Sequence, residues 1–193
     1  MTENQKLRAL PPVEASPGVL VHPASDRALA TEHWLLATHR EPRRARLEWQ
    51  EHQLAVLPLG ALFSACRLPA RLVLALAGGT GPSREVDAVL AEVLEGGPVI
   101  CDPHGHRYYA LVPATMPTSW RAAFRDWEPA GVEALGRGAY LGVPRVDLTA
   151  YDPRTRASYW SVPMTSAATL CAPLAVARLI TAAQQLLPSE GTE

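Results

Sequence analysis

The stretch from Gly97 to Val143 constrains the fold more than any other part of the chain. It begins GPVICDPHGHRYYALVP, where an apolar run precedes the turn-forming residues 102–105 and an aromatic, branched segment at 107–112 follows them. Strand, turn and strand in that order predict a β-hairpin. A second unit, GVEALGRGAYLGVP, places two glycines between short apolar runs. Glycines so close together favour a tight turn or bulge, and this unit is also predicted to form a hairpin.

We expect an α+β fold with a central, mainly antiparallel sheet and helices packed on it. The central sheet is predicted to contain residues 99–101, 107–112, 132–135, 139–143 and 158–162, and a further strand is predicted over 47–58. Helices are predicted at residues 25–39, 61–66, 84–94, 118–127 and 173–187, from capping residues, apolar spacing and prolines suited to a first turn. We expect residues 1–24 to be a flexible leader, 25–188 a single domain and 189–193 a tail.

Composition agrees with a folded domain. The chain has 193 residues, 48% of them hydrophobic and 19% charged, which is typical of globular proteins. A net charge of −1 gives no overall case for nucleic-acid binding, so any such surface has to be a local patch. Lys6 is the only lysine beside many arginines, which indicates GC-rich coding of an actinobacterial type.

Cysteine usage and hydropathy indicate the compartment. Cys66, Cys101 and Cys171 are odd in number and widely spaced, which favours buried, reduced thiols over a disulfide framework or a zinc ribbon. No apolar run reaches membrane-spanning length, and the polar, proline-rich beginning lacks the apolar core of a signal peptide. We expect a cytoplasmic protein without a membrane partner.

Three segments resemble the core of the bifunctional primase/polymerase (prim-pol) domains of the archaeo-eukaryotic primase superfamily. They are GHRYYALVP at 105–113, GVEALGRGAYLGVP at 131–144 and ASYWSVP at 157–163. The resemblance implies a sheet-and-helix core in which His106 matches a histidine-bearing strand. It also implies polymerase chemistry, in which clustered carboxylates hold two divalent metals.

The chain departs from that family where the chemistry would occur. No predicted strand carries two acidic residues one position apart, the spacing that puts both carboxylates on one face. Ser64 stands where a carboxylate would be wanted, and Asp147 or Asp152 could stand only for a later acid. We therefore interpret the chain as a degenerate relative that binds without turnover.

Candidate site residues come from the same segments. His106, Arg107, Arg137, Tyr140 and Tyr109 are candidates for binding nucleic acid or a nucleotide, because guanidinium groups grip phosphates and aromatic rings stack on bases. Asp102, His104 and His106 are candidates for a divalent metal because they lie close together, but we favour ordinary turn chemistry as the explanation of this segment. No cofactor is expected. Arg40–Arg46 is interpreted as a solvated linker broken by Pro42, and Gly78–Gly81 as a plain connection.

Three functions remain open. The chain is interpreted first as a degenerate prim-pol-like domain that binds nucleic acid or nucleotide, or docks onto replication or regulatory machinery. The second interpretation is a protein–protein interaction module with only structural likeness to that family. The third is an active metal-dependent nucleotidyltransferase using Asp102, His106, Asp147 and Asp152. Charge around His106 separates them, because acids favour chemistry, arginine and tyrosine favour binding, and an apolar patch favours docking.

Overall fold

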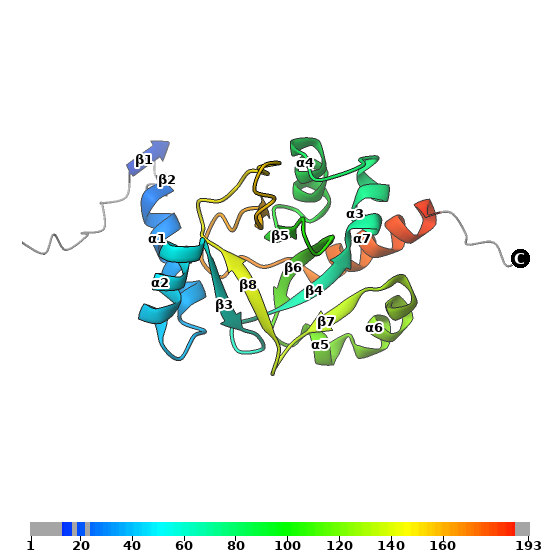
Figure 1. Cartoon of the computed structure of the whole chain (residues 1–193), viewed down its shortest axis with the longest axis horizontal. Helices are drawn as coiled ribbons and strands as arrows, with labels where there is room; N and C mark the ends of the chain where they lie inside the picture. Colours follow the sequence, from blue (N-terminus) through cyan, green and yellow to red (C-terminus); the bar gives the residue numbers. More distant parts are fainter. Residues whose placement is uncertain (1–12, 17–18, 22–23, 188–193) are drawn as a thin grey trace, which may run out of the picture.

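The computed structural model describes residues 13–16, 19–21 and 24–187 (Figure 1). The helices are α1 Ala24–Leu36, α2 Pro42–His52, α3 Ala70–Ala77, α4 Arg84–Val93, α5 Met116–Ser119, α6 Arg121–Trp127 with the 3₁₀ turn η1 Glu128–Ala130, and α7 Pro173–Leu186. The strands are β1 Val13–Ser16, β2 Val19–Val21, β3 Leu54–Pro58, β4 Phe63–Pro69, β5 Val99–Asp102, β6 Arg107–Pro113, β7 Glu133–Leu135, β8 Tyr140–Pro144 and β9 Tyr159–Val162.

A five-stranded sheet in the order β7-β4-β6-β5-β9 forms the centre of the molecule. Every neighbouring pair in it is antiparallel, and helices pack on it, which confirms the predicted α+β class. The first predicted hairpin is also confirmed, because β5 and β6 pair directly and Asp102 lies opposite Arg107. The turn chemistry between them is local, so the sequence alone defines it.

The second predicted hairpin is wrong. Strands β7 and β8 do not pair with each other: β7 pairs with β4, and β8 pairs with β3 in a separate two-stranded sheet. The segment β3–β4 turns from one sheet to the other at 60–63, and the segment β7–β8 does so at 136–139. The two segments therefore stay antiparallel to each other around this corner. Gly60 is needed there, because its φ is +87° and a Cβ would lie 2.5 Å from the Arg137 Cα.

Side chains from both faces of the central sheet are buried in two cores. On β6, Tyr108 and Ala110 belong to the core that α3, α4 and α7 cover, whereas Leu111 belongs to the opposite core. That opposite core is closed by α1, α2 and the β3–β8 pair (Figure 1), with Trp49 of α2 fully buried in it. The Trp49 indole Nε1–H donates to the Val143 carbonyl at 2.8 Å, which ties α2 to β8.

Three predictions for the first half of the chain are wrong. Residues 40–46 are not a linker, since α2 begins at Pro42, whose ring suits a first helical turn. The strand predicted over 47–58 begins only at Leu54, after α2 ends at His52 and Gln53 caps it with a φ of +60°. Of residues 61–66, predicted to be helical, 63–66 belong to strand β4, most of which is buried on both faces. A strand buried on both faces has a continuous apolar sequence instead of alternating apolar and polar residues. Periodicity therefore does not distinguish it from a buried helix.

Other helices agree with prediction. Ser83 caps α4 by accepting the Val86 N–H at 3.3 Å, and α7 begins at Pro173. The helix predicted over 118–127 is divided into α5 and α6 and starts earlier, at Met116. Of the predicted leader, the described part includes the antiparallel pair β1–β2, whereas residues 1–12 and the tail at 189–193 lie outside the described residues. Within the described ranges, no helix combines the length and apolar character needed to cross a bilayer.

Candidate functional site

The turn between β5 and β6 is fixed by its own residues. The Asp102 carboxylate Oδ1 accepts the Gly105 backbone N–H at 3.0 Å. His106 follows with a φ of +51°, an uncommon backbone conformation for a residue with a side chain. Its carbonyl accepts the Ala70 N–H at 2.9 Å, which joins the turn to the first residue of α3. The side chains of this turn are therefore held against the start of a helix.

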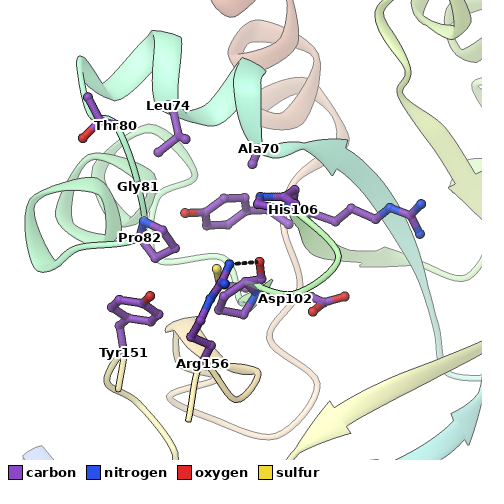
Figure 2. Close-up of a pocket in the computed structure, with 13 residues that line it drawn as sticks. Ala70, Leu74, Thr80, Gly81, Pro82, Asp102, His106, Tyr151 and Arg156 are labelled. Atoms are coloured by element: carbon purple, nitrogen blue, oxygen red, sulfur yellow. Dashed lines mark hydrogen bonds between the residues drawn. The ribbon is translucent and has the colours of Figure 1, made fainter. Parts of the chain in front are cut away.

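This turn borders a cavity of about 250 Å³. The other walls come from α3, from the loop ahead of α4, and from the segment between β8 and β9. Figure 2 shows these contributions as Leu74, Pro82, Tyr151 and Arg156 around the hollow. The cavity-lining residues are Ala70, Leu74, Thr80, Gly81, Pro82, Cys101, Asp102, Pro103, His106, Arg107, Tyr108, Tyr151 and Arg156.

The segment containing Arg156 is attached to the β5–β6 turn. The Arg156 guanidinium donates to the Pro103 carbonyl at 3.4 Å (Figure 2), and a ring nitrogen of His104 lies 3.3 Å from the Thr155 carbonyl. Arg156 also has a φ of +51°, so two polar residues at the cavity have the same uncommon backbone conformation. Such conformations persist only where surrounding contacts hold them, and they concentrate at functional sites.

Two arginines that border the cavity differ from the other charged groups nearby. Arg107 and Arg156 are exposed, and neither forms an ion pair with another described residue. By contrast, Arg145 is held by Asp147 through two hydrogen bonds of 2.6 and 2.9 Å. The Arg156 guanidinium bonds only one carbonyl in this part of the fold, so its other N–H donors can attract an anionic ligand. Arg107 alternates with Tyr108 along β6, so its side chain leaves on the face of Tyr109.

A row of polar side chains crosses three adjacent strands beneath the cavity. Cys101 on β5 lies opposite Tyr108 on β6 and opposite Tyr159 on β9. The Tyr159 hydroxyl donates to the Asp87 carboxylate of α4 at 3.0 Å, and the Ser161 hydroxyl donates to the same carboxylate. Burial raises the pKa of Cys101 to about 12 and raises the pKa of both tyrosines, so all three groups keep their protons at neutral pH.

The predicted site residues are divided among three places. Asp102, His106 and Arg107 line the cavity together. Tyr109 points to the opposite face of β6 and packs in the other core. Arg137 and Tyr140 lie at the corner between β7 and β8, where Tyr140 is 67% exposed. The candidate binding set is therefore not one surface.

The proposed acidic residues are also separate. Asp147 pairs with Arg145, and Asp152 accepts the Arg154 backbone N–H at 2.9 Å within its own turn. Across the described ranges, no three or more His, Cys, Asp or Glu side chains come together in a way that could hold a metal ion. Asp102, His104 and His106 are thus neighbours in sequence that do not form such a group.

Sequence reasoning missed several residues that line the cavity or lie below it. Arg156 and Tyr151 come from the segment between β8 and β9, for which no site residue other than Asp147 and Asp152 was predicted. Asp87 lies on the face of α4 toward β9, and its hydrogen bonds to β9 need the tertiary fold. The row of polar side chains could have been found in part from strand register. Once β5 and β6 pair through the predicted turn, Cys101 has to lie opposite Tyr108.

The chain was compared with protein-family models, curated proteins and solved structures. No family model, curated protein or solved structure matches the chain.

Proposed function

We propose that the cavity binds a nucleoside phosphate, with the base inside and the phosphate at the rim, and that the chain does not turn the ligand over. The observation that carries this proposal is a ring-sized hollow with Arg156 beside it, an arginine that forms no ion pair with another described residue. The proposal keeps the first interpretation of the sequence, a domain that binds a nucleotide without turnover. It is supported by the cavity and by no relative.

Size favours a single planar ring system. An apolar cavity of about 150 Å³ accommodates benzene, whereas drug-sized ligands occupy roughly 300–1,000 Å³. The hollow here measures about 250 Å³, between the two. A nucleobase fits this range, and the sugar and phosphate then extend toward the surface. The ring of Tyr151 and the apolar walls from Leu74 and Pro82 supply the contacts that a flat ring needs.

Charge favours an anionic group at the rim. A guanidinium binds phosphate oxygens through paired N–H donors and stays protonated at every physiological pH. Arg156 is held by its bond to Pro103 and has further donors free for such a ligand. Asp102 brings one opposing charge, but its Oδ1 already accepts the Gly105 N–H. The remaining Arg156 donors are therefore the groups at the rim that can bind an anionic ligand.

Binding without turnover follows from where the carboxylates lie. A two-metal site needs acids fixed on one face of rigid elements. Two acidic pairs have one residue between their members, Glu85–Asp87 on α4 and Asp126–Glu128 at the α6–η1 junction. In a helix, side chains at this i, i+2 spacing do not share a face. Asp147 is engaged by Arg145 away from the cavity lining.

A second candidate function, protein docking, is favoured by one observation. Leu47 on α2 and Val56 on β3 are about half exposed, at 54% and 48%, beside a groove between these elements. This surface is separate from the cavity, so the two functions can be tested independently.

Isothermal titration calorimetry tests the nucleotide proposal. The four ribonucleoside monophosphates, ribose 5-phosphate and the free nucleosides are each titrated into the protein at low and at high salt. We expect a monophosphate to bind more tightly than ribose 5-phosphate or the nucleoside, and affinity to fall as salt rises. A short single-stranded oligonucleotide distinguishes binding of a free nucleotide from binding of a strand.

Arg156→Ala and Arg154→Ala form a matched pair of variants. Arg154 is two residues away, does not line the cavity and has a side chain that is 90% exposed. Losing a partly exposed charged contact costs about 1 kcal/mol, or roughly fivefold in Kd. We expect this loss for Arg156→Ala and unchanged affinity for Arg154→Ala. Absence of monophosphate binding at low salt, or equal affinity in the two variants, would contradict the proposal.

Turnover is tested separately with a primed template, nucleoside triphosphates and Mg²⁺ or Mn²⁺. We expect no primer extension and no primer synthesis. Metal-dependent extension that Asp102→Ala or Asp147→Ala abolishes would make the chain an active nucleotidyltransferase.

A further inference from the structure

One polar atom at the cavity has no partner. Tyr108 is a cavity-lining residue that is 1% exposed, and its buried hydroxyl makes no hydrogen bond to any described residue. The Cys101 thiol beside it offers at most a weak hydrogen bond, because sulfur is a poor acceptor. Buried hydroxyls are nearly always hydrogen-bonded, because leaving one unpaired loses its hydration without replacement.

The hydroxyl of the neighbouring tyrosine, Tyr159, does have a hydrogen-bond partner, unlike that of Tyr108. Tyr159, two strands away in the same row, donates its proton to Asp87 at 3.0 Å. Tyr108 has the same burial and the same face of the sheet, but no carboxylate lies within its reach. Burial raises the pKa of Tyr108, so its hydroxyl remains protonated and needs an acceptor.

We infer that the Tyr108 hydroxyl recognises the base by donating to an acceptor on its inner edge, a carbonyl oxygen or an unprotonated ring nitrogen. The inference rests on the proposed nucleotide binding and specifies its ligand class: a flat heteroaromatic ring with an acceptor edge. A purely hydrocarbon ring of the same shape would leave the hydroxyl unpaired. Sites built to hydrogen-bond a ligand discriminate strongly against analogues that lack the bonding atom.

An internal water is the competing occupant. A buried water is held by two to four polar partners. Besides the Tyr108 hydroxyl, the polar side chains of the row are the Cys101 thiol and the Tyr159 hydroxyl, whose proton Asp87 accepts. A water there would give Tyr108 a partner in the free protein, whereas a base acceptor gives it one only in the complex.

Two variants separate these occupants in the free protein. Tyr159→Phe removes a hydrogen bond that exists, so it should lower the melting temperature. Tyr108→Phe removes a hydroxyl without a partner, so the melting temperature should stay the same or rise. If Tyr108→Phe lowers it as much as Tyr159→Phe does, the hydroxyl holds a water or another internal partner, and the inference is overturned.

Binding is measured with a natural nucleoside monophosphate and with its nonpolar isostere, in which fluorine and methyl groups replace the hydrogen-bonding groups of the base. The control is Tyr109→Phe, the adjacent tyrosine that packs in the opposite core. Tyr108→Phe should weaken the natural nucleotide about fivefold and leave binding of the isostere unchanged. Tyr109→Phe should change neither affinity.

The outcomes distinguish the two levels of the proposal. If the wild-type protein binds the natural nucleotide but Tyr108→Phe binds it equally well, the inference fails and the nucleotide proposal stands. If the wild-type protein binds the isostere as tightly as the natural nucleotide, the inference fails in the same way. If no nucleotide binds to the wild-type protein, both fail.

Discussion

Gly105→Ala should disrupt the turn that carries the site. A Cβ at Gly105 would lie 3.0 Å from the Asp102 Cγ and still closer to its Oδ2. The carboxylate then has to rotate away, which breaks the 3.0 Å bond from the Gly105 N–H. Hydrogen bonds to charged groups contribute about 1.5–3 kcal/mol, and partial exposure of Asp102 reduces this to about 1–2 kcal/mol. For a chain of this length the melting temperature should fall by about 2–8 °C.

A double-mutant cycle checks this cause by thermal unfolding followed by circular dichroism. In the Asp102→Ala background the clash and the hydrogen bond are both gone, so Gly105→Ala should cost only a few tenths of a kcal/mol. Gly81→Ala is the control, because no atom lies within 4 Å of its added Cβ. An equal cost of Gly105→Ala in both backgrounds would refute the reasoning.

Three further predictions concern stability. Gly97→Ala places a Cβ 2.7 Å from the Cys171 Sγ and should destabilise the protein by about 1–3 kcal/mol in urea unfolding. Trp49→Phe removes the 2.8 Å hydrogen bond to the Val143 carbonyl and should lower the free energy of unfolding by about 1–3 kcal/mol in the same assay. An unchanged free energy of unfolding would show that this hydrogen bond does not stabilise the packing of α2 on β8. Burial raises the pKa of Asp87 above 3.8, so the folded protein binds this proton more tightly than the unfolded chain does. This contribution to the free energy of unfolding is complete below pH 3.8 and is lost as the pH rises through the folded-state pKa. Relative to Asp87→Asn, the wild-type melting temperature should therefore fall as pH increases from 3.8, and a constant difference would contradict this.

Local chemistry allowed part of the fold and site to be predicted. The β5–β6 hairpin follows from its turn residues, and it brings Asp102, His106 and Arg107 to one place. The unit at 131–144 has similar turn chemistry, but its strands pair with β3 and β4 instead of each other. The same glycines fit either arrangement, because the pairing is decided by partners more than 60 residues away in sequence.

The remaining site residues could not be found from local patterns. Arg156 reaches the cavity through a bond to Pro103, 53 positions earlier in the chain. Tyr108 and Tyr109 look alike in sequence, yet they face opposite cores, and only Tyr108 lines the cavity. Alternation along β6 separates them, but the choice of face depends on which helices cover each side of the sheet.

The most direct test of nucleotide binding at this cavity is an amide chemical-shift titration of the full chain with a nucleoside monophosphate. The account predicts saturable shifts in three segments that line the cavity, at 80–82, 101–108 and 151–156, with the corner at 137–140 unaffected. Shifts centred on Arg137 and Tyr140, or no saturable shifts, would contradict it.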